Sequence, residues 1–273
     1  MWNANAKKPI WSFLALTFII ASVSDGLLIL VEQSGVFSEM LSGIAGFIIV
    51  TMYRGITAGS APAWAMYILL KRHNQIRGFK DFFSLIFKTE SKSKTVIITA
   101  VFFLALFLIR LLTSQYLGDS WFAVLGTLPL LIAGIIGGGM EEPGWRGFFQ
   151  PALEEKLPFV VATLCVGVIW AVWHIPAWFV QSIGMSSINF LSFTLHCITL
   201  SFVMTALYKL TKNVFAVVIF HSWTNALGSV FLSEHLQSAP DFKLIIISTL
   251  QIITAIVICT FIDKKKKELT HSV

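Results

Sequence analysis

The sequence predicts an all-α integral membrane protein, a polytopic bundle of about eight transmembrane helices that forms one membrane domain over residues 1–273. Of the 273 residues, 56% are hydrophobic and only 12% are charged, whereas about a quarter of the residues in soluble domains are charged. The mean hydropathy is +0.80. So little polar surface excludes a soluble globule, and the apolar residues are grouped in long runs.

The apolar runs give the positions of the expected spans. A helix needs about 20 mostly apolar residues to cross the hydrocarbon core. The second run is too long for one span, so we expect it to tilt, to break near Gly55 and Gly59, or to form a hairpin. The eight predicted spans are residues 10–31, 40–70, 95–117, 121–150, 159–180, 190–208, 214–232 and 243–262.

The distribution of Lys and Arg predicts the orientation. With the amino terminus inside, every inner segment carries Lys or Arg, and the four outer loops carry none, as the positive-inside rule requires. We therefore expect a multi-pass protein of a bacterial plasma membrane with both termini in the cytoplasm. Basic clusters at residues 71–94 and 264–267 flank apolar spans, so they predict contact with the lipid bilayer and not with nucleic acid. Residues 78–88 predict an amphipathic helix on the inner interface.

Two adjacent carboxylates, Glu141 and Glu142, interrupt the fourth apolar run. On a helix, Glu142 and Arg146 are four residues apart and face each other, so they are expected to pair. Glu141 lies about 100° around the helix and is left without that partner. An unpaired carboxylate in an apolar setting suits general acid or base catalysis. A purely structural Glu-Glu-Arg cluster is the alternative.

His174 lies in the fifth apolar run, at a depth that matches Glu141. The inner turn between the two runs falls near residues 156–158. Glu141 and His174 are each about 16 residues from that turn, which is roughly 24 Å along a helix. A helical hairpin would therefore bring the two side chains to one level. A structural histidine in the core is the alternative.

His221 and Asn225 are four residues apart and share a helix face. Two hydrogen-bond donors directed at one point make an oxyanion hole, although polar residues can also simply join helices. Glu141, His174 and His221 are the ligand set if the protein binds zinc, but the sequence has no HExxH motif. The spacing leaves metal and metal-free chemistry open.

Other ionisable residues also fall within the spans. Asp25 and Arg54 each lie roughly 22–24 Å from the inner ends of consecutive spans, so we predict that they pair. The competing possibilities are Arg54 reaching toward the outer loop and Asp25 pairing with Arg110. His196 is interpreted as structural.

Together the motifs resemble the CPBP family of intramembrane peptidases, also called the Abi family, which includes the type II CAAX prenyl endopeptidases. Trp170 is a departure, because the eukaryotic CAAX enzymes have Phe there. The resemblance covers a core of about residues 95–262, with the motifs at 141–225. The matching segments are Glu141-Glu142-Pro143-Gly144-Trp145-Arg146, Trp170-Ala171-Val172-Trp173-His174 and His221-Ser222-Trp223-Thr224-Asn225.

The resemblance implies an endopeptidase that hydrolyses a membrane-associated, prenylated or leader-peptide substrate. In that reaction Glu141 and His174 would activate the attacking water, and His221 and Asn225 would stabilise the oxyanion. Glu142 and Arg146 would hold the site together. The candidate catalytic residues are Glu141, Glu142, Arg146, His174, His221 and Asn225.

Other functions remain open at this point. A membrane regulator or bacteriocin self-immunity protein could keep the fold and bind a partner without cleaving it. A small transporter would predict repeated halves, which the sequence lacks. The complete Glu/His/His/Asn set favours the peptidase, of metallopeptidase or metal-free glutamate type. We favour no cofactor, with zinc as the alternative.

The orientation gives a first testable prediction. A reporter enzyme that is active only outside the cytoplasm, fused after Val273, should be inactive because the Lys-rich tail stays inside. Reporter activity in whole cells is the measurement, and the same reporter fused behind a secretion signal is the positive control. Strong activity of the fusion would contradict the eight-span topology.

Overall fold

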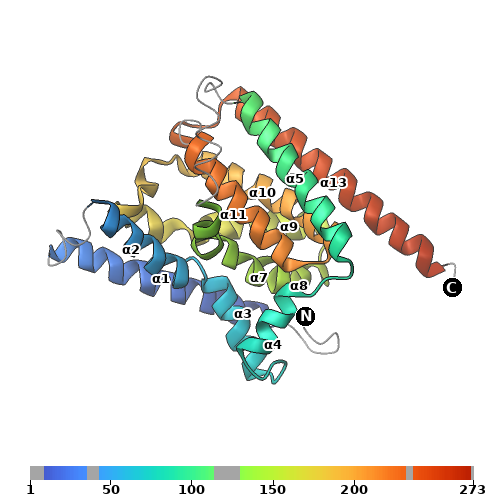
Figure 1. Ribbon diagram of the computed structural model, residues 1–273, viewed down its shortest axis with the longest axis horizontal. Helices are drawn as coiled ribbons and strands as arrows, with labels where there is room; N and C mark the ends of the chain where they lie inside the picture. The colour runs from blue at the N-terminus through green and yellow to red at the C-terminus, as the bar shows by residue number, and fades with distance from the viewer. Residues whose placement is uncertain (1–8, 36–42, 114–129, 232–235, 272–273) are drawn as a thin grey trace.

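The computed structural model describes residues 9–35, 43–113, 130–231 and 236–271, and every regular element in these ranges is a helix (Figure 1). The predicted all-α membrane bundle is confirmed, whereas the predicted number of eight spans stays a prediction. A shorter apolar helix covers Val214–Gly228. Among the described residues, five helices are long and apolar enough to cross a membrane: Ile10–Ser34, Lys92–Ile109, Phe159–Phe179, Phe190–Thr211 and Phe242–Lys266.

The helices differ widely in length. The long ones are α1 (Ile10–Ser34), α5 (Lys92–Thr113), α9 (Phe159–Trp173), α10 (Phe190–Thr211), α11 (Val214–Phe231) and α13 (Phe242–His271). The short ones are α2 (Gly43–Ile56), α3 (Ala61–Arg72), α4 (Phe79–Phe87), α7 (Glu142–Gly144) and α8 (Gln150–Glu154). Residues 130–137 are also helical. The tighter or wider turns are η1 (Gly139–Glu141), the π-helix η2 (Trp145–Phe149), η3 (Ile175–Phe179), η4 (Gln181–Ile183) and η5 (Met185–Ser187).

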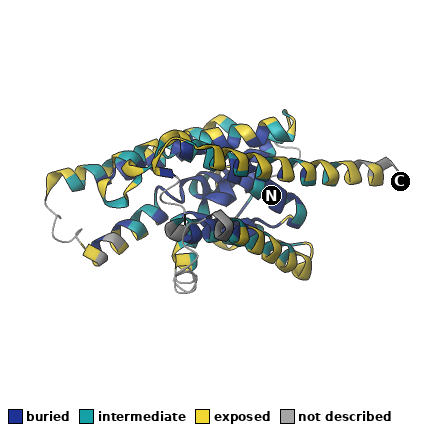
Figure 2. Ribbon diagram, turned by 90° about the horizontal axis from the view of Figure 1, so that it is seen from above, coloured by how far each residue is buried: buried dark blue, intermediate teal, exposed yellow. Residues whose placement is uncertain are grey.

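Helix α10 is the centre of the packing, in contact with α9, α13, α11 and α5. On the opposite side α1 packs against α3, which in turn contacts α7 (Figure 1). Buried residues gather in the middle of the bundle, and the outer faces of the peripheral helices are exposed (Figure 2). Those outer faces carry apolar side chains such as Val96 and Phe261. Apolar outer faces of this kind suit a lipid environment.

The second apolar run is broken between α2 and α3, near Gly55 and Gly59, which is one of the three alternatives that the sequence left open. Backbone carbonyls freed by the break have new partners: Ser60 Oγ donates to Gly55 O at 2.6 Å, and Trp64 Nε1 donates to Ile56 O at 2.7 Å. Backbone polar groups in a membrane must be satisfied within the protein. These side-chain donors therefore allow the chain to bend inside the bundle.

The fourth apolar run is not the single regular helix that the sequence analysis assumed. After residues 130–137 the chain passes through η1, α7, the π-helix and α8. In the π-helix the Gln150 amide donates to Trp145 O, five residues earlier. Pro151 follows, and a proline removes one helical hydrogen bond and clashes with the preceding turn. The wider π-turn accommodates this proline, and π-turns are frequent at functional sites.

The predicted pair of Asp25 and Arg54 is confirmed. Arg54 Nε lies 3.1 Å from Asp25 Oδ1, and Asp25 is only 1% exposed. Two more polar contacts join α1 to the same stretch: Ser24 Oγ lies 2.5 Å from Thr57 Oγ1, and the Tyr53 hydroxyl donates to Ser24 O at 3.3 Å. The position of α2 against α1 is therefore fixed by polar contacts within the bundle.

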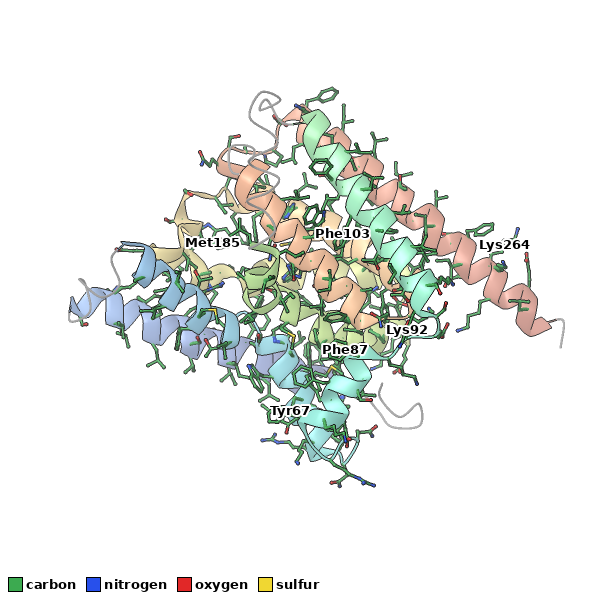
Figure 3. The ribbon with its side chains drawn as sticks, viewed as in Figure 1. Tyr67, Phe87, Lys92, Phe103, Met185 and Lys264 are labelled. Atoms are coloured by element: carbon green, nitrogen blue, oxygen red, sulfur yellow. The ribbon has the colours of Figure 1, made fainter. Side chains whose placement is uncertain are left out.

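The amphipathic helix predicted at residues 78–88 is present as α4. Its Phe82 and Ile86 are buried, whereas Phe83 is exposed. The Tyr67 ring of α3, which is labelled in Figure 3, stacks on Phe79 with the ring centroids 4.5 Å apart. One face of α4 is therefore held against the bundle, and its exposed side chains are both apolar, as Phe83 and Phe87 are, and polar, as Lys80 is.

Close helix packing at two glycines gives a second prediction. A Cβ at Gly144 would overlap the backbone of Pro62, and a Cβ at Gly167 would lie 2.7 Å from Ile198 Cα. Gly144→Ala and Gly167→Ala should each destabilise the protein by roughly 1–3 kcal/mol, because backbone cannot give way as a flexible side chain can. Thermal unfolding in detergent is the measurement.

The matched control is Gly26→Ala in α1, where a Cβ meets nothing within 4 Å. This variant should unfold at the same temperature as the wild type or slightly higher, because alanine favours a helix over glycine. Equal losses of thermal stability in Gly144→Ala, Gly167→Ala and Gly26→Ala would contradict this close helix packing.

Candidate active site

A buried carboxylate, Glu142, joins three segments of the bundle. Arg146 Nη1 lies 3.1 Å from Glu142 Oε1 and 3.0 Å from Oε2, and both side chains are 0% exposed. The predicted pairing is therefore confirmed. His221 Nδ1 lies 2.8 Å from Glu142 Oε1, a contact that the spacing did not predict. Arg146 Nη2 also donates to Ser201 Oγ on α10 at 3.1 Å.

Glu141, the residue before Glu142, has a different hydrogen-bond partner. Trp170 Nε1 donates to Glu141 Oε2 at 2.5 Å, so the prediction of an unpartnered carboxylate needs correction. The other oxygen, Oε1, has no hydrogen-bond partner among the described residues. The Arg146 guanidinium lies 5.3 Å from the Trp170 ring centroid, within the range of a cation–π contact. Trp170 therefore fixes Glu141 and leaves one oxygen available.

The same Trp170 also orients His174, through its backbone. His174 Nδ1 lies 2.9 Å from Trp170 O. A carbonyl oxygen only accepts hydrogen bonds, so Nδ1 must carry the proton, and Nε2 of the neutral ring is then an acceptor. The Trp173 and Phe193 rings pack edge-on against the imidazole, with centroids 4.6 and 5.0 Å away. These contacts hold the histidine where α9 ends.

His221 and Asn225 lie on one face of α11 and meet over a glycine. A Cβ at Gly138 would lie 3.4 Å from His221 Nε2 and would collide with Asn225 Nδ2. The two nitrogen atoms are therefore on the same side of this backbone turn, which has room for them because residue 138 has no side chain. With Nδ1 bonded to Glu142, the Nε2 atom of His221 donates only when the ring is an imidazolium.

These side chains line one pocket. Glu141, His174, His221 and Asn225 all contribute to a cavity of about 420 Å³, within the usual size of ligand sites, about 300–1,000 Å³. The helical hairpin thus brings Glu141 and His174 to one cavity, as the matched depths indicated. Glu142 and Arg146 lie behind the pocket wall and not in its described lining.

Two further residues of the lining were not predicted as site residues. His196 was interpreted as structural, but it lines the pocket, and so does Arg54. The matching depth of Asp25 and Arg54 indicated their pairing, but the rotation of α2 that turns Arg54 toward the cavity leaves no signal in the spacing. His196 is not part of any motif with a second polar residue, so nothing in the sequence indicated that it lines the pocket.

The predicted zinc ligands do not form a metal site in the described part of the chain. No group of three or more His, Cys, Asp or Glu side chains is arranged there to hold a metal ion. Glu141 Oε2 already accepts a hydrogen bond from Trp170, and His221 Nδ1 already donates one to Glu142.

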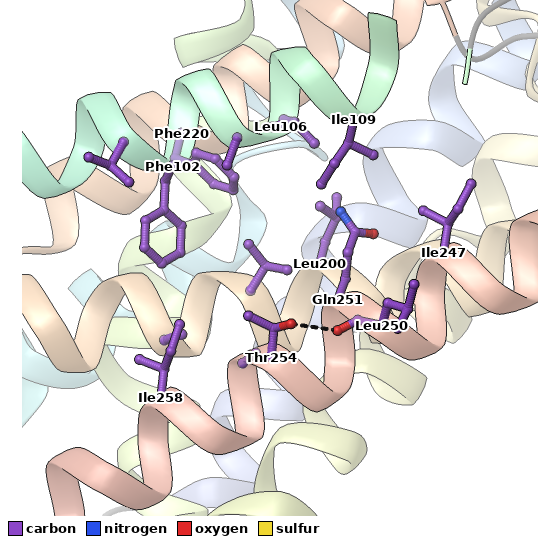
Figure 4. A pocket seen from close by; sticks show the side chains of 15 residues that line it. Phe102, Leu106, Ile109, Leu200, Phe220, Ile247, Leu250, Gln251, Thr254 and Ile258 are labelled. Atoms are coloured by element: carbon purple, nitrogen blue, oxygen red, sulfur yellow. Dashed lines mark hydrogen bonds between the residues drawn. The ribbon is translucent and has the colours of Figure 1, made fainter. Parts of the chain in front are cut away.

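A second cavity, of about 490 Å³, lies between α5, α10 and α13 (Figure 4). Its described lining is almost wholly apolar, with Phe102, Leu106 and Ile258 among its residues. Its polar side chains are Gln251 and Thr254, and the Thr254 hydroxyl is bonded within its own helix to Leu250 O at 2.8 Å. The described lining of this cavity holds no titratable group.

The helical membrane bundle places a carboxylate, two imidazoles and an amide around one pocket, and the comparisons with known proteins support an intramembrane peptidase. Residues 121–227 match the family described as type II CAAX prenyl endopeptidase Rce1-like, and all three motifs lie within this segment. The chain is also 25% identical over 250 residues to CAAX prenyl protease 2 of Methanococcus maripaludis, covering 85% of this chain and 88% of that protein. These findings confirm the resemblance to the CPBP family and support an Rce1-like intramembrane protease.

The buried cluster gives a third prediction. Arg146→Met should strongly destabilise the protein, by roughly 3–5 kcal/mol, because it leaves a buried carboxylate without its cation. Adding Glu142→Gln to Arg146→Met should recover much of the loss, because the charge that lacks a partner is removed. The yield of folded protein after gel filtration in detergent is the measurement. A double variant no better folded than Arg146→Met would show that the ion pair is not the source of the effect.

Proposed function

We propose that this protein is an intramembrane endopeptidase in which Glu141 and His174 activate the water that attacks a peptide bond. The observation that supports this most strongly is the convergence of Glu141, His174, His221 and Asn225 on one pocket. These residues come from three separate segments of the chain. A cavity with a carboxylate, two imidazoles and an amide has the groups that peptide hydrolysis needs.

The first step uses two acceptor atoms that have no hydrogen-bond partner among the described residues. Glu141 Oε1 and His174 Nε2 accept hydrogen bonds from one water molecule and orient it. The water oxygen then attacks the peptide carbonyl carbon, and its proton passes to Glu141, the general base. The carbonyl electrons move to oxygen and give a tetrahedral oxyanion. Trp170 supports this step because it positions both residues.

The second step breaks the peptide bond. Asn225 Nδ2 and an imidazolium form of His221 donate to the oxyanion, and Glu142 holds the opposite nitrogen of that ring at 2.8 Å. The intermediate collapses as the C–N bond breaks and the proton on Glu141 passes to the leaving amine. The products are a carboxylic acid and an amine, and Glu141 is ionised again for the next cycle.

The name of the matched relative and the apolar helices around the site support a substrate class. We propose a membrane-associated peptide, of which a prenylated CAAX sequence is the first to test because of the name of the matched relative. A leader peptide that lies in the bilayer is the second. The rival function, a regulator or self-immunity protein that only binds, has no need of a base and an oxyanion hole in one pocket. No specific observation favours it.

A fourth prediction tests the catalytic roles. Glu141→Gln and His174→Ala should each lower the rate by about 10²–10⁴, because each removes a group that activates water. Asn225→Ala should lower the rate by a factor of about 10²–10³, the range for the loss of one oxyanion donor. The measurement is cleavage of a prenylated CAAX peptide by purified protein in proteoliposomes, with thermal unfolding as a check on folding.

Glu90→Gln is the matched control for Glu141→Gln, because Glu90 is exposed in the loop before α5. This control should keep full activity. If Glu141→Gln also cleaves at the wild-type rate, Glu141 is not the general base.

A fifth prediction concerns metal. Purified protein with full activity should hold much less than one zinc per chain, and a zinc chelator should leave its activity unchanged. The measurement is the zinc content of the purified protein by elemental analysis, together with its activity in the peptide-cleavage assay. One zinc per chain, lost together with activity on chelation and restored with it, would overturn the metal-free mechanism.

A further inference from the structure

Arg54 is a cation in the wall of the candidate active site that the mechanism does not use. It lines the same pocket as Glu141 and His174, and its side chain is only 16% exposed. Its positive charge acts on both of these residues. Among the described residues, however, its ion pair is with Asp25 and not with Glu141.

The contact with Asp25 occupies only part of the guanidinium. Arg54 Nε donates to Asp25 Oδ1 at 3.1 Å, and within the described part of the chain Nη1 and Nη2 have no hydrogen-bond partner. Arginine has five N–H donors in a planar fork. The edge formed by Nη1 and Nη2 remains, and its geometry matches the two oxygens of a carboxylate.

Asp25 holds this fork in position before any ligand arrives. Asp25 is 1% exposed, and the contacts of Ser24 with Thr57 and Tyr53 fix the helix around it. An arginine that is already oriented loses less conformational freedom when it binds a ligand. The arrangement is therefore built to receive a second anion beside Asp25.

The pocket lining carries charges of both signs, the Glu141 carboxylate and the Arg54 guanidinium. The Glu141 carboxylate repels an anionic group of a substrate, and Arg54 attracts it, so such a group would be directed to the α2 side of the cavity. The cavity holds only about 420 Å³, enough for a short piece of peptide. A chain end fits such a space more readily than an internal segment, because it need not leave the cavity again.

We propose that Arg54 binds the carboxyl-terminal carboxylate of the substrate and so directs cleavage to a bond near the free end of a peptide. This inference rests on the proposed endopeptidase function. Arg54 acts as a specificity-determining residue, and Asp25 positions it. An acidic side chain of the substrate offers the same carboxylate chemistry, so the test separates the two sources.

The test compares three forms of one prenylated CAAX peptide: a free carboxylate, a carboxamide, and a carboxamide whose last residue is Glu. Wild-type protein should cleave the free acid with a kcat/KM about 10- to 100-fold above that of the plain amide, as expected for a lost charge-assisted pair. Arg54→Gln should remove this preference by slowing the acid alone. Arg54→Lys should keep part of it, since lysine retains the charge but not the fork.

Two further variants control for folding. Arg72→Gln, at the exposed end of α3, should keep the wild-type preference. Asp25→Asn combined with Arg54→Gln removes both charges, so no buried carboxylate is left unpaired if the single variant folds poorly. This double variant should also cleave acid and amide equally.

Binding to the Glu141→Gln protein in nanodiscs, followed by fluorescence anisotropy of labelled peptides, separates this inference from the proposed function. Tighter binding of the free acid, lost with Arg54→Gln, supports the role of Arg54 even if no peptide is cleaved. Three outcomes would overturn it: no preference for the acid in the wild type, equal effects of Arg54→Gln on acid and amide, or a preference that follows the Glu side chain.

Discussion

The arrangement of this site depends on the hydrogen bonds that one buried carboxylate, Glu142, makes with Arg146 and His221. Inside a bilayer, a guanidinium without an anion is costly, and so is a carboxylate without a donor. Because Arg146 also reaches Ser201 on α10, Glu142 links the irregular fourth segment to two long helices. The contact with Glu142 holds His221 in position, and Glu141 is the residue that precedes Glu142 in the chain.

The irregular backbone around Glu142 separates the two carboxylates into different environments. The change from η1 to α7 and then to the π-helix turns Glu141 toward Trp170 and the cavity, while Glu142 stays behind the wall. Such backbone is tolerated at membrane depth where it is buried in protein or lines a cavity. Gly138 contributes because its missing side chain leaves space for His221 and Asn225. One carboxylate is thereby structural, and the other is available for chemistry.

Sequence reasoning succeeded where helix geometry alone decides the outcome. The spacing of four residues predicted the pair of Glu142 and Arg146, and the rise per residue predicted the pair of Asp25 and Arg54. It could not give contacts that depend on how helices rotate about their axes. Trp170 reaches Glu141 across 29 positions and His221 reaches Glu142 across 79, and neither contact leaves a periodic pattern. The π-turn and the helix rotation that brings Arg54 into the pocket wall likewise leave no periodic pattern in the sequence.

The central claim is that this site hydrolyses peptide bonds within the membrane. The most direct measurement compares the peptides in membranes of cells that make either the wild-type protein or Glu141→Gln at equal levels. Mass spectrometry should detect a defined set of peptide ends that occurs only with the wild type, together with the uncleaved precursors in the variant. Identical peptide pools from the two membranes, under conditions in which the protein is present and folded, would contradict the account.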